Sequence, residues 1–151
     1  MSVVAMSGND AVTINNTVLS DLADGDCVVL EFPNEIATVK TGKNGNTIYA
    51  QNQMGNNAEA KLRVIRGSSD DNFLNSLLLT QQGNFQSNVN IIGTFVKLVG
   101  DGKGNITNDT YILSGGVFQK LVMAKTNAEG DSAQSVSEYS IKFASAQRTL
   151  T

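Results

Sequence analysis

The sequence predicts a mostly β (α+β) fold, with two packed antiparallel β-sheets forming a sandwich or partial barrel beside one flanking α-helix. Three observations predict this class. Several short segments alternate apolar and polar residues, glycine (14 residues) and asparagine (17 residues) separate them, and one segment has helical apolar spacing. A chain of 151 residues is long enough for one domain with a real core, so we expect residues 1–151 to form a single domain.

The first half of the chain contains most of the predicted strands. They are expected at residues 11–15, 18–20, 27–32, 36–41, 47–50 and 58–66. The last of these alternates apolar and charged residues, which predicts one buried and one charged face. The apolar set is Ala58, Ala60, Leu62 and Val64, and the charged set is Glu59, Lys61 and Arg63.

A tight hairpin is predicted at Asn44-Gly45, because this dipeptide favours a two-residue turn in which both residues take positive φ. The polar segment that follows, residues 51–57, has no clear periodicity and belongs to the class of segments that a neighbour often orders.

One helix is predicted, from about residue 71 to residue 82. Asp70 or Asp71 would cap its start, since a carboxylate accepts the free N–H groups of the first turn, and Gly83 would end it. Its apolar stripe consists of Phe73, Leu74, Leu77 and Leu78. Beyond the helix, strands are expected at 89–99, 110–113, 117–125 and 139–146. Turns at 100–105 and Gly115-Gly116 and a polar loop at 126–136 would separate these strands.

The composition argues against an enzyme. The chain has no histidine, which is the commonest general base near neutral pH and the commonest transition-metal ligand. The single cysteine, Cys27, lies in an apolar strand, which favours a small buried hydrophobe over a reactive thiol. The loop at 101–105 lacks the ligand spacing of a calcium site and the following helix of a phosphate loop, which favours a hairpin. We therefore expect no catalytic residue, no cofactor and no metal.

Charge and composition argue against several classes of binding partner. A net charge of −3, a missing tryptophan and the lack of a basic patch argue against tight nucleic-acid or sugar binding. Neither a signal-peptide pattern nor an apolar run of membrane-spanning length is present, so no membrane partner is expected. The charged strand face has two interpretations. It is either simply solvated, or it meets a large polar surface or lines a wet channel.

The order of these elements resembles the tail tube proteins of contractile-tailed bacteriophages, the inner tube of myovirus-type tails. The resemblance rests on the acidic turn Leu22-Ala23-Asp24-Gly25-Asp26, the hairpin around Asn44-Gly45, the charged strand, and the helix start Ser69-Asp70-Asp71-Asn72-Phe73-Leu74. Two later segments, 95–102 and 138–143, also resemble that family, so the match covers most of residues 11–147.

The resemblance implies a structural subunit. Six copies would form a ring, neighbouring sheets would join into an inner β-barrel, and helically stacked rings would form a hollow tube. DNA would pass through this tube during ejection into the host without specific binding. An acidic tube would repel the phosphate backbone within a Debye length of ~8 Å. Tail sheath, baseplate and tail terminator proteins are the implied partners. The implied location is the virion tail, assembled in the host bacterial cytoplasm.

The resemblance also assigns positions. Strands 27–32, 36–41 and 58–66 would contribute to the inner sheet, with Glu59, Lys61 and Arg63 as the lumen face. The inter-ring hairpin would include Asn44, Gly45, Asn46, Gln53 and Asn56. The outer helix would present Phe73, Leu74, Leu77 and Leu78. Two alternatives stay open, namely a tube subunit of a related contractile injection or secretion device and a small β-sandwich binding or decoration module.

Overall fold

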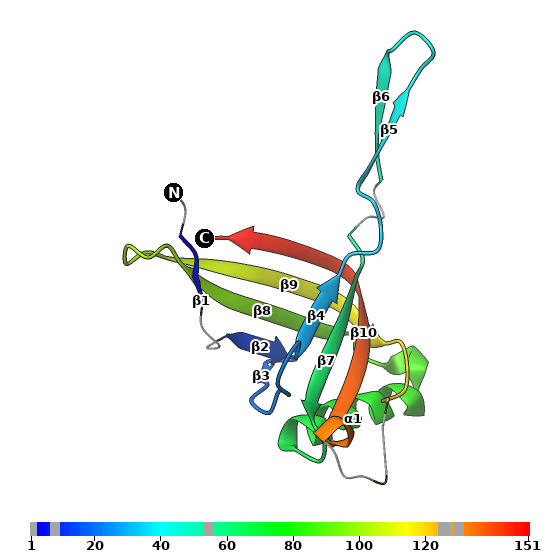
Figure 1. The fold of residues 1–151 in the computed structure, drawn as a ribbon. Coiled ribbons are helices and arrows are strands. Elements are labelled where there is room, and N and C mark those ends of the chain that lie inside the picture. Colours follow the sequence, from blue (N-terminus) through cyan, green and yellow to red (C-terminus); the bar gives the residue numbers. More distant parts are fainter. Residues whose placement is uncertain (1–2, 7–9, 53–55, 124–127, 129–131) are drawn as a thin grey trace.

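The computed structural model describes residues 3–6, 10–52, 56–123, 128 and 132–151 (Figure 1). Its helical elements are α1 (Ser69–Gly83) and two 3-10 turns, η1 (Phe85–Ser87) and η2 (Ser132–Ser135). Its strands are β1 (Ala5–Met6), β2 (Ala11–Ile14), β3 (Thr17–Val18), β4 (Val28–Glu31), β5 (Ala37–Thr41), β6 (Thr47–Gln51), β7 (Ala58–Ile65), β8 (Ile91–Gly100), β9 (Ile106–Phe118) and β10 (Val136–Leu150).

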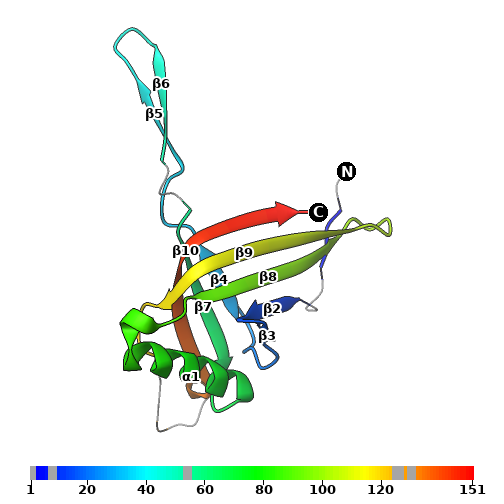
Figure 2. The ribbon, with the colours of Figure 1, turned by 180° about the vertical axis from the view of Figure 1, so that it is seen from behind.

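The strands form two antiparallel sheets, and the predicted fold class is confirmed. The main sheet has the order β3-β2-β8-β9-β10-β7-β4, with β1 pairing with β8 beside β2. It bends over its own core as a partial barrel, and α1 lies beside it (Figures 1 and 2). The second sheet contains only β5 and β6, and it projects from the body as an arm. Strand 36–41, expected in the inner sheet, therefore lies outside the main sheet.

The core lies between the two halves of the bent sheet and α1. The alternation predicted for β7 is confirmed, because the four residues of its predicted apolar set, Ala58, Ala60, Leu62 and Val64, are fully buried. From β10, Tyr139, Ile141 and Phe143 pack into the same core, and α1 adds Leu74 and Leu78. Burial on this scale supplies most of the favourable free energy of folding.

The predicted turn at Gly115-Gly116 is wrong, because β9 runs through both glycines. Gly115 has a φ of +68°, and the pairing of β8 with β9 shifts register between Ile91 and Gly93, which marks a bulge. A Cβ on Gly116 would lie 2.6 Å from Phe143 Cε1, so the missing side chain makes room for that buried ring. The glycines therefore bend a continuous strand, and the strand expected at 117–125 ends at Phe118.

Two further local predictions are corrected. The α1 N-cap is Ser68, whose hydroxyl accepts from the Asp71 amide at 3.3 Å, while Asp70 and Asp71 lie inside the first turn. At the arm tip, Gly45 has a φ of +83° but Asn44 stays at negative φ, and the Gly45 amide donates to the Gly42 carbonyl. This is a type I turn closed by a left-handed glycine rather than the predicted two-residue turn.

The turn between β2 and β3 has the geometry that was expected at the arm tip. Asn15 and Asn16, at φ of 48° and 66°, connect the two strands as a two-residue turn with both residues at positive φ. The hairpin at 101–105 is confirmed, since the Asp101 carboxylate accepts from the Lys103 amide at 2.7 Å and the Asn105 amide at 3.2 Å.

Candidate assembly surfaces

The arm is the most exposed part of the described chain. Every residue from Glu31 to Asn52 is exposed, including Val39 at 60%, Ile48 at 64% and Tyr49 at 77% of their full accessible surface. Val39 lies opposite Tyr49, and Lys40 lies opposite Ile48, so each face of the arm carries an exposed apolar side chain. An isolated two-stranded hairpin is marginally stable in water at best, so this arm has the character of a docking element.

The structure separates the residues predicted for the hairpin contact. Asn44, Gly45 and Asn46 lie in the loop at the arm tip. Asn56 lies at the base, where its carbonyl accepts from the Ala146 amide at 3.0 Å and ties the chain to β10. Gln53 is outside the described residues. The residues predicted for this contact therefore lie at opposite ends of the arm.

The charged residues predicted for the lumen lie on one face of β7, opposite the core. Glu59 pairs across the strands with Lys142 and Arg63 with Glu138, so opposite charges face one another. Arg63 also donates to the Asp24 carbonyl at 3.2 Å, which ties its side chain to the acidic turn. Together β4, β7 and β10 place equal numbers of acidic and basic residues on this face: Glu31, Glu59 and Glu138 with Lys61, Arg63 and Lys142.

The helix residues predicted for the outer surface face inward. Leu74 and Leu78 are buried in the core, and Phe73 and Leu77 pack against it half-buried. A different apolar surface follows along the chain, where Leu79, Phe85, Val89 and Ile92 are exposed. The sequence also indicates this surface, since no charged residue occurs from position 72 to position 96. Depletion of charge is typical of the centre of a protein interface.

A buried polar network holds the start of α1 on the sheet. The Asp71 carboxylate accepts from the hydroxyl groups of Tyr139 and Ser137 and from the Gly67 amide. Burial, together with the hydrogen bond to Asp71, raises the pKa of Tyr139 well above its ordinary value. The Asp70 carboxylate accepts from the Asp21 amide. The two acidic residues of the helix start are therefore structural.

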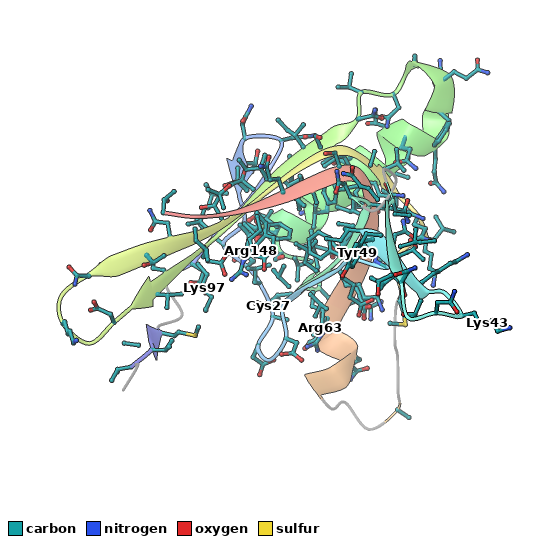
Figure 3. The ribbon with its side chains drawn as sticks, turned by 90° about the horizontal axis from the view of Figure 1, so that it is seen from above. Cys27, Lys43, Tyr49, Arg63, Lys97 and Arg148 are labelled. Atoms are coloured by element: carbon teal, nitrogen blue, oxygen red, sulfur yellow. The ribbon has the colours of Figure 1, made fainter. Side chains whose placement is uncertain are left out.

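A cleft opens where β4 and β8 face each other without pairing. Its volume is about 430 Å³, and its apolar wall includes Val12, Val28, Leu30, Phe95 and Tyr111. Cys27 lies on this wall half-exposed, so the prediction that it is a buried hydrophobe is wrong. Figure 3 labels Cys27 and Lys97 on the body, with Lys43 apart from them on the arm.

The rim of the cleft is charged, and two of its three carboxylates, those of Asp10 and Asp109, form salt bridges. Lys97 Nζ lies 2.7 Å from Asp10 Oδ2. Arg148 binds both carboxylate oxygens of Asp109 at 2.8 and 2.9 Å and lies over the Tyr111 ring. The hydrogen bond from Arg148 lowers the pKa of Asp109 below its ordinary value. Asp26 completes the acidic side of the rim.

The described residues contain no group of three or more acidic, cysteine or histidine side chains placed to hold a metal ion. Within the same part of the chain, neither α1 nor the 3-10 turns are long and apolar enough to cross a membrane.

Comparison with known proteins gives matches in structure only. No family model and no curated protein matches the sequence. The cap of the anti-feeding prophage, a tube-terminating cap, matches with a TM-score of 0.61 and 8% identity over 97% of this chain and 92% of that one.

Two matching chains come from an extracellular contractile injection system, PVC. One belongs to its sheath–tube complex in the extended state (TM-score 0.59, 13% identity, 94% of this chain and 88% of that one). The other belongs to its sheath/tube terminator in the extended state (TM-score 0.58, 11% identity, 95% and 94%). These matches cover nearly the whole chain on both sides, and they confirm the tail-tube-like fold that the sequence predicts.

Proposed function

We propose that this chain is a structural subunit of a phage-type tail tube, built as a single tail-tube-like domain that performs no bond chemistry. The observation that carries the proposal is the shared fold, which covers at least 94% of this chain and 88% of each matching chain. In this proposal, six copies close into a ring, and rings stack helically into a hollow tube.

The open edges of the main sheet support ring formation. The sheet ends at β4 on one side and at β3 on the other, and β10 continues beyond its last pairing with β7 at Phe143. Open edges carry unpaired N–H and C=O groups that invite aggregation. A head-to-tail contact between identical copies covers such edges, and it makes a closed ring when the rotation closes.

The charged face of β7 is the proposed lumen wall. Its acidic and basic residues are equal in number, so free passage of DNA would not depend on repulsion by an acidic tube. Three acidic and three basic residues give this face no net charge, so a phosphate backbone would be neither held nor repelled over a long range. Passage without specific binding follows from this balance rather than from the overall acidity. Sheath, baseplate and terminator proteins of the tail are the further partners proposed, in a virion tail assembled in the bacterial cytoplasm.

A second candidate is a tube cap or terminator of a contractile injection device. Two of the matching structures are named as a cap and a terminator, which favours this possibility directly. A terminator closes the end of a tube, so its purified subunit would form single rings, whereas a tube subunit would form stacks.

The test is the assembly state of the purified full chain. Sedimentation and negative-stain images over a range of protein concentrations should show rings of six copies and, for a tube subunit, hollow stacks. A variant in which a short Gly-Ser linker replaces residues 37–51 should form rings but no stacks, because its body keeps every core residue. Single rings from the unaltered chain would favour the terminator, and a monomer at high concentration would refute both candidates.

A further inference from the structure

The cleft between β4 and β8 has an unfilled apolar wall. Val28 and Leu30 of β4 are only half-buried although they point into the barrel, and Leu22 and Cys27 beside them are half-exposed as well. A fully closed barrel would bury these side chains. Because β4 is an end strand of the sheet, nothing within the described chain covers this wall.

The arm has the matching chemistry. Its distal part, residues 37–51, contains Lys40 and Lys43 and no acidic residue, although the whole chain has a net charge of −3. Without these two lysines the rest of the chain would carry −5, so the arm is a basic element on an acidic molecule. Opposite charge steers two copies together in the orientation that brings arm to body.

One face of the arm combines this charge with an apolar side chain. Lys40 and Ile48 are cross-strand partners and therefore lie on the same face, while Tyr49 lies on the other. The rim of the cleft offers Asp26, whereas Asp10 is already held by Lys97. The arm projects away from its own body in both ribbon views, so an arm that fills a cleft belongs to another molecule (Figures 1 and 2).

We propose that the cleft of one copy receives the Lys40 face of the arm of a second copy, an inference that rests on the proposed assembly of identical subunits. Ile48 packs on the wall formed by Val28 and Leu30, and Lys40 reaches Asp26 at the rim. Each molecule has one arm and one cleft, so the contact is head-to-tail and propagates from copy to copy.

Cys27 provides a direct test, because it is the only cysteine of the chain and lies on the cleft wall. In an Ile48→Cys variant, mild oxidation should trap disulfide-linked chains in a ladder of dimers and larger species, since a disulfide needs Cβ atoms about 3.5–4.5 Å apart. The matched control is Tyr49→Cys, one residue away on the opposite face and also exposed, at 77% against 64% for Ile48. An Ile48→Cys, Cys27→Ala double variant identifies links formed between two arms.

The outcomes separate this inference from the proposed function. A ladder from Ile48→Cys alone supports the docking. No ladder, or equal ladders from both variants, overturns it, and rings or stacks of the unaltered chain in images would still stand. Conversely, a ladder from a chain that forms no closed ring would support the contact between arm and cleft and would refute the proposed tube.

Charge reversal gives an independent check. Lys40→Glu and Asp26→Lys should each weaken association by roughly tenfold, because each replaces an attraction with a repulsion. The double variant should recover association to within roughly threefold of the unaltered chain. Lys120→Glu makes the same charge change on an exposed side chain outside the arm, and it should have less than a twofold effect. Failure of the double variant to recover would contradict the pairing of Lys40 with Asp26.

Discussion

Replacing Gly116 with alanine tests the bend that turns one continuous sheet into a partial barrel. The new Cβ would lie 2.6 Å from Phe143 Cε1 and 2.9 Å from the Ile91 carbonyl oxygen. Ordinary contact begins near 3.4 Å, so the ring would have to retreat by about 0.8 Å. Phe143 is fully buried, and the Ile91 oxygen is part of the backbone, so neither atom can move without disturbing the core.

Overpacking of this kind costs about 1–3 kcal/mol, and two close contacts place Gly116→Ala in the upper half of that range. For a chain of this size, each kcal/mol lowers Tm by roughly 2–4 °C, so we expect a decrease of about 4–12 °C. Urea titration followed by circular dichroism, at one fixed protein concentration, measures the change in the free energy of unfolding.

The control is Gly83→Ala at the end of α1, where a Cβ meets no atom within 4 Å and φ is not positive. It should be neutral or stabilise by up to ~1 kcal/mol. Phe143→Leu should cost less in the Gly116→Ala background than alone, because the shorter side chain relieves the clash. A Gly116→Ala chain within ~0.5 kcal/mol of the unaltered protein would refute the bend as described.

Three other substitutions test the core, the helix anchor and the first turn. Leu74→Ala should cost about 2–5 kcal/mol of unfolding free energy, whereas Leu79→Ala, on an exposed side chain of the same helix, should cost less than ~0.5 kcal/mol. Equal losses of unfolding free energy for the two variants would contradict the packing of α1 described above. Because the pKa of Tyr139 is raised on folding, its contribution is complete below about pH 10 and is lost as pH rises further. Tyr139→Phe should therefore reduce the loss of unfolding free energy as the pH rises above about 10, and an unchanged pH dependence in urea titrations would contradict the network. Asn16→Ala should cost about 1–2 kcal/mol and Asn16→Gly almost nothing, because only the former strains a residue at a φ of 66°. Thermal unfolding that ranks the two variants equally would disprove that turn.

Sequence patterns predicted correctly those elements in which one face packs on the core and the other meets solvent. The alternation in β7 identified its buried residues, since a strand between core and solvent repeats every two residues. The apolar spacing of α1 identified Leu74 and Leu78 for the corresponding reason. The cap was misassigned because Ser68, Asp70 and Asp71 are all good capping residues. Tyr139 and Asp21, which hold the two carboxylates, come from distant parts of the chain.

The candidate surfaces depended more on contacts between distant segments. Residues 36–41 and 47–50 are rich in β-branched and apolar residues, as packed strands are, yet they form an arm, because no other part of the described chain covers them. The cleft combines β4 with β8, although β5, β6, β7 and α1 lie between them in the sequence, and the local spacing of residues cannot indicate that two such distant segments approach each other. The charge of the β7 face likewise became balanced only when register placed Glu31 of β4 beside it, since Glu138 and Lys142 of β10 cancel each other.

The amino-acid sequence was sufficient to predict the fold class. Alternation and turn residues indicated a mostly β fold with one helix, because these properties are local, and the order of the elements carried the resemblance to tail tube proteins. Contacts between distant segments determine that Gly115 and Gly116 bend a strand instead of ending it, that β5 and β6 leave the sheet, and that Cys27 lies on an open cleft. The reason is physical: a residue's own neighbours in sequence set its backbone preferences, but packing partners far along the chain set its burial.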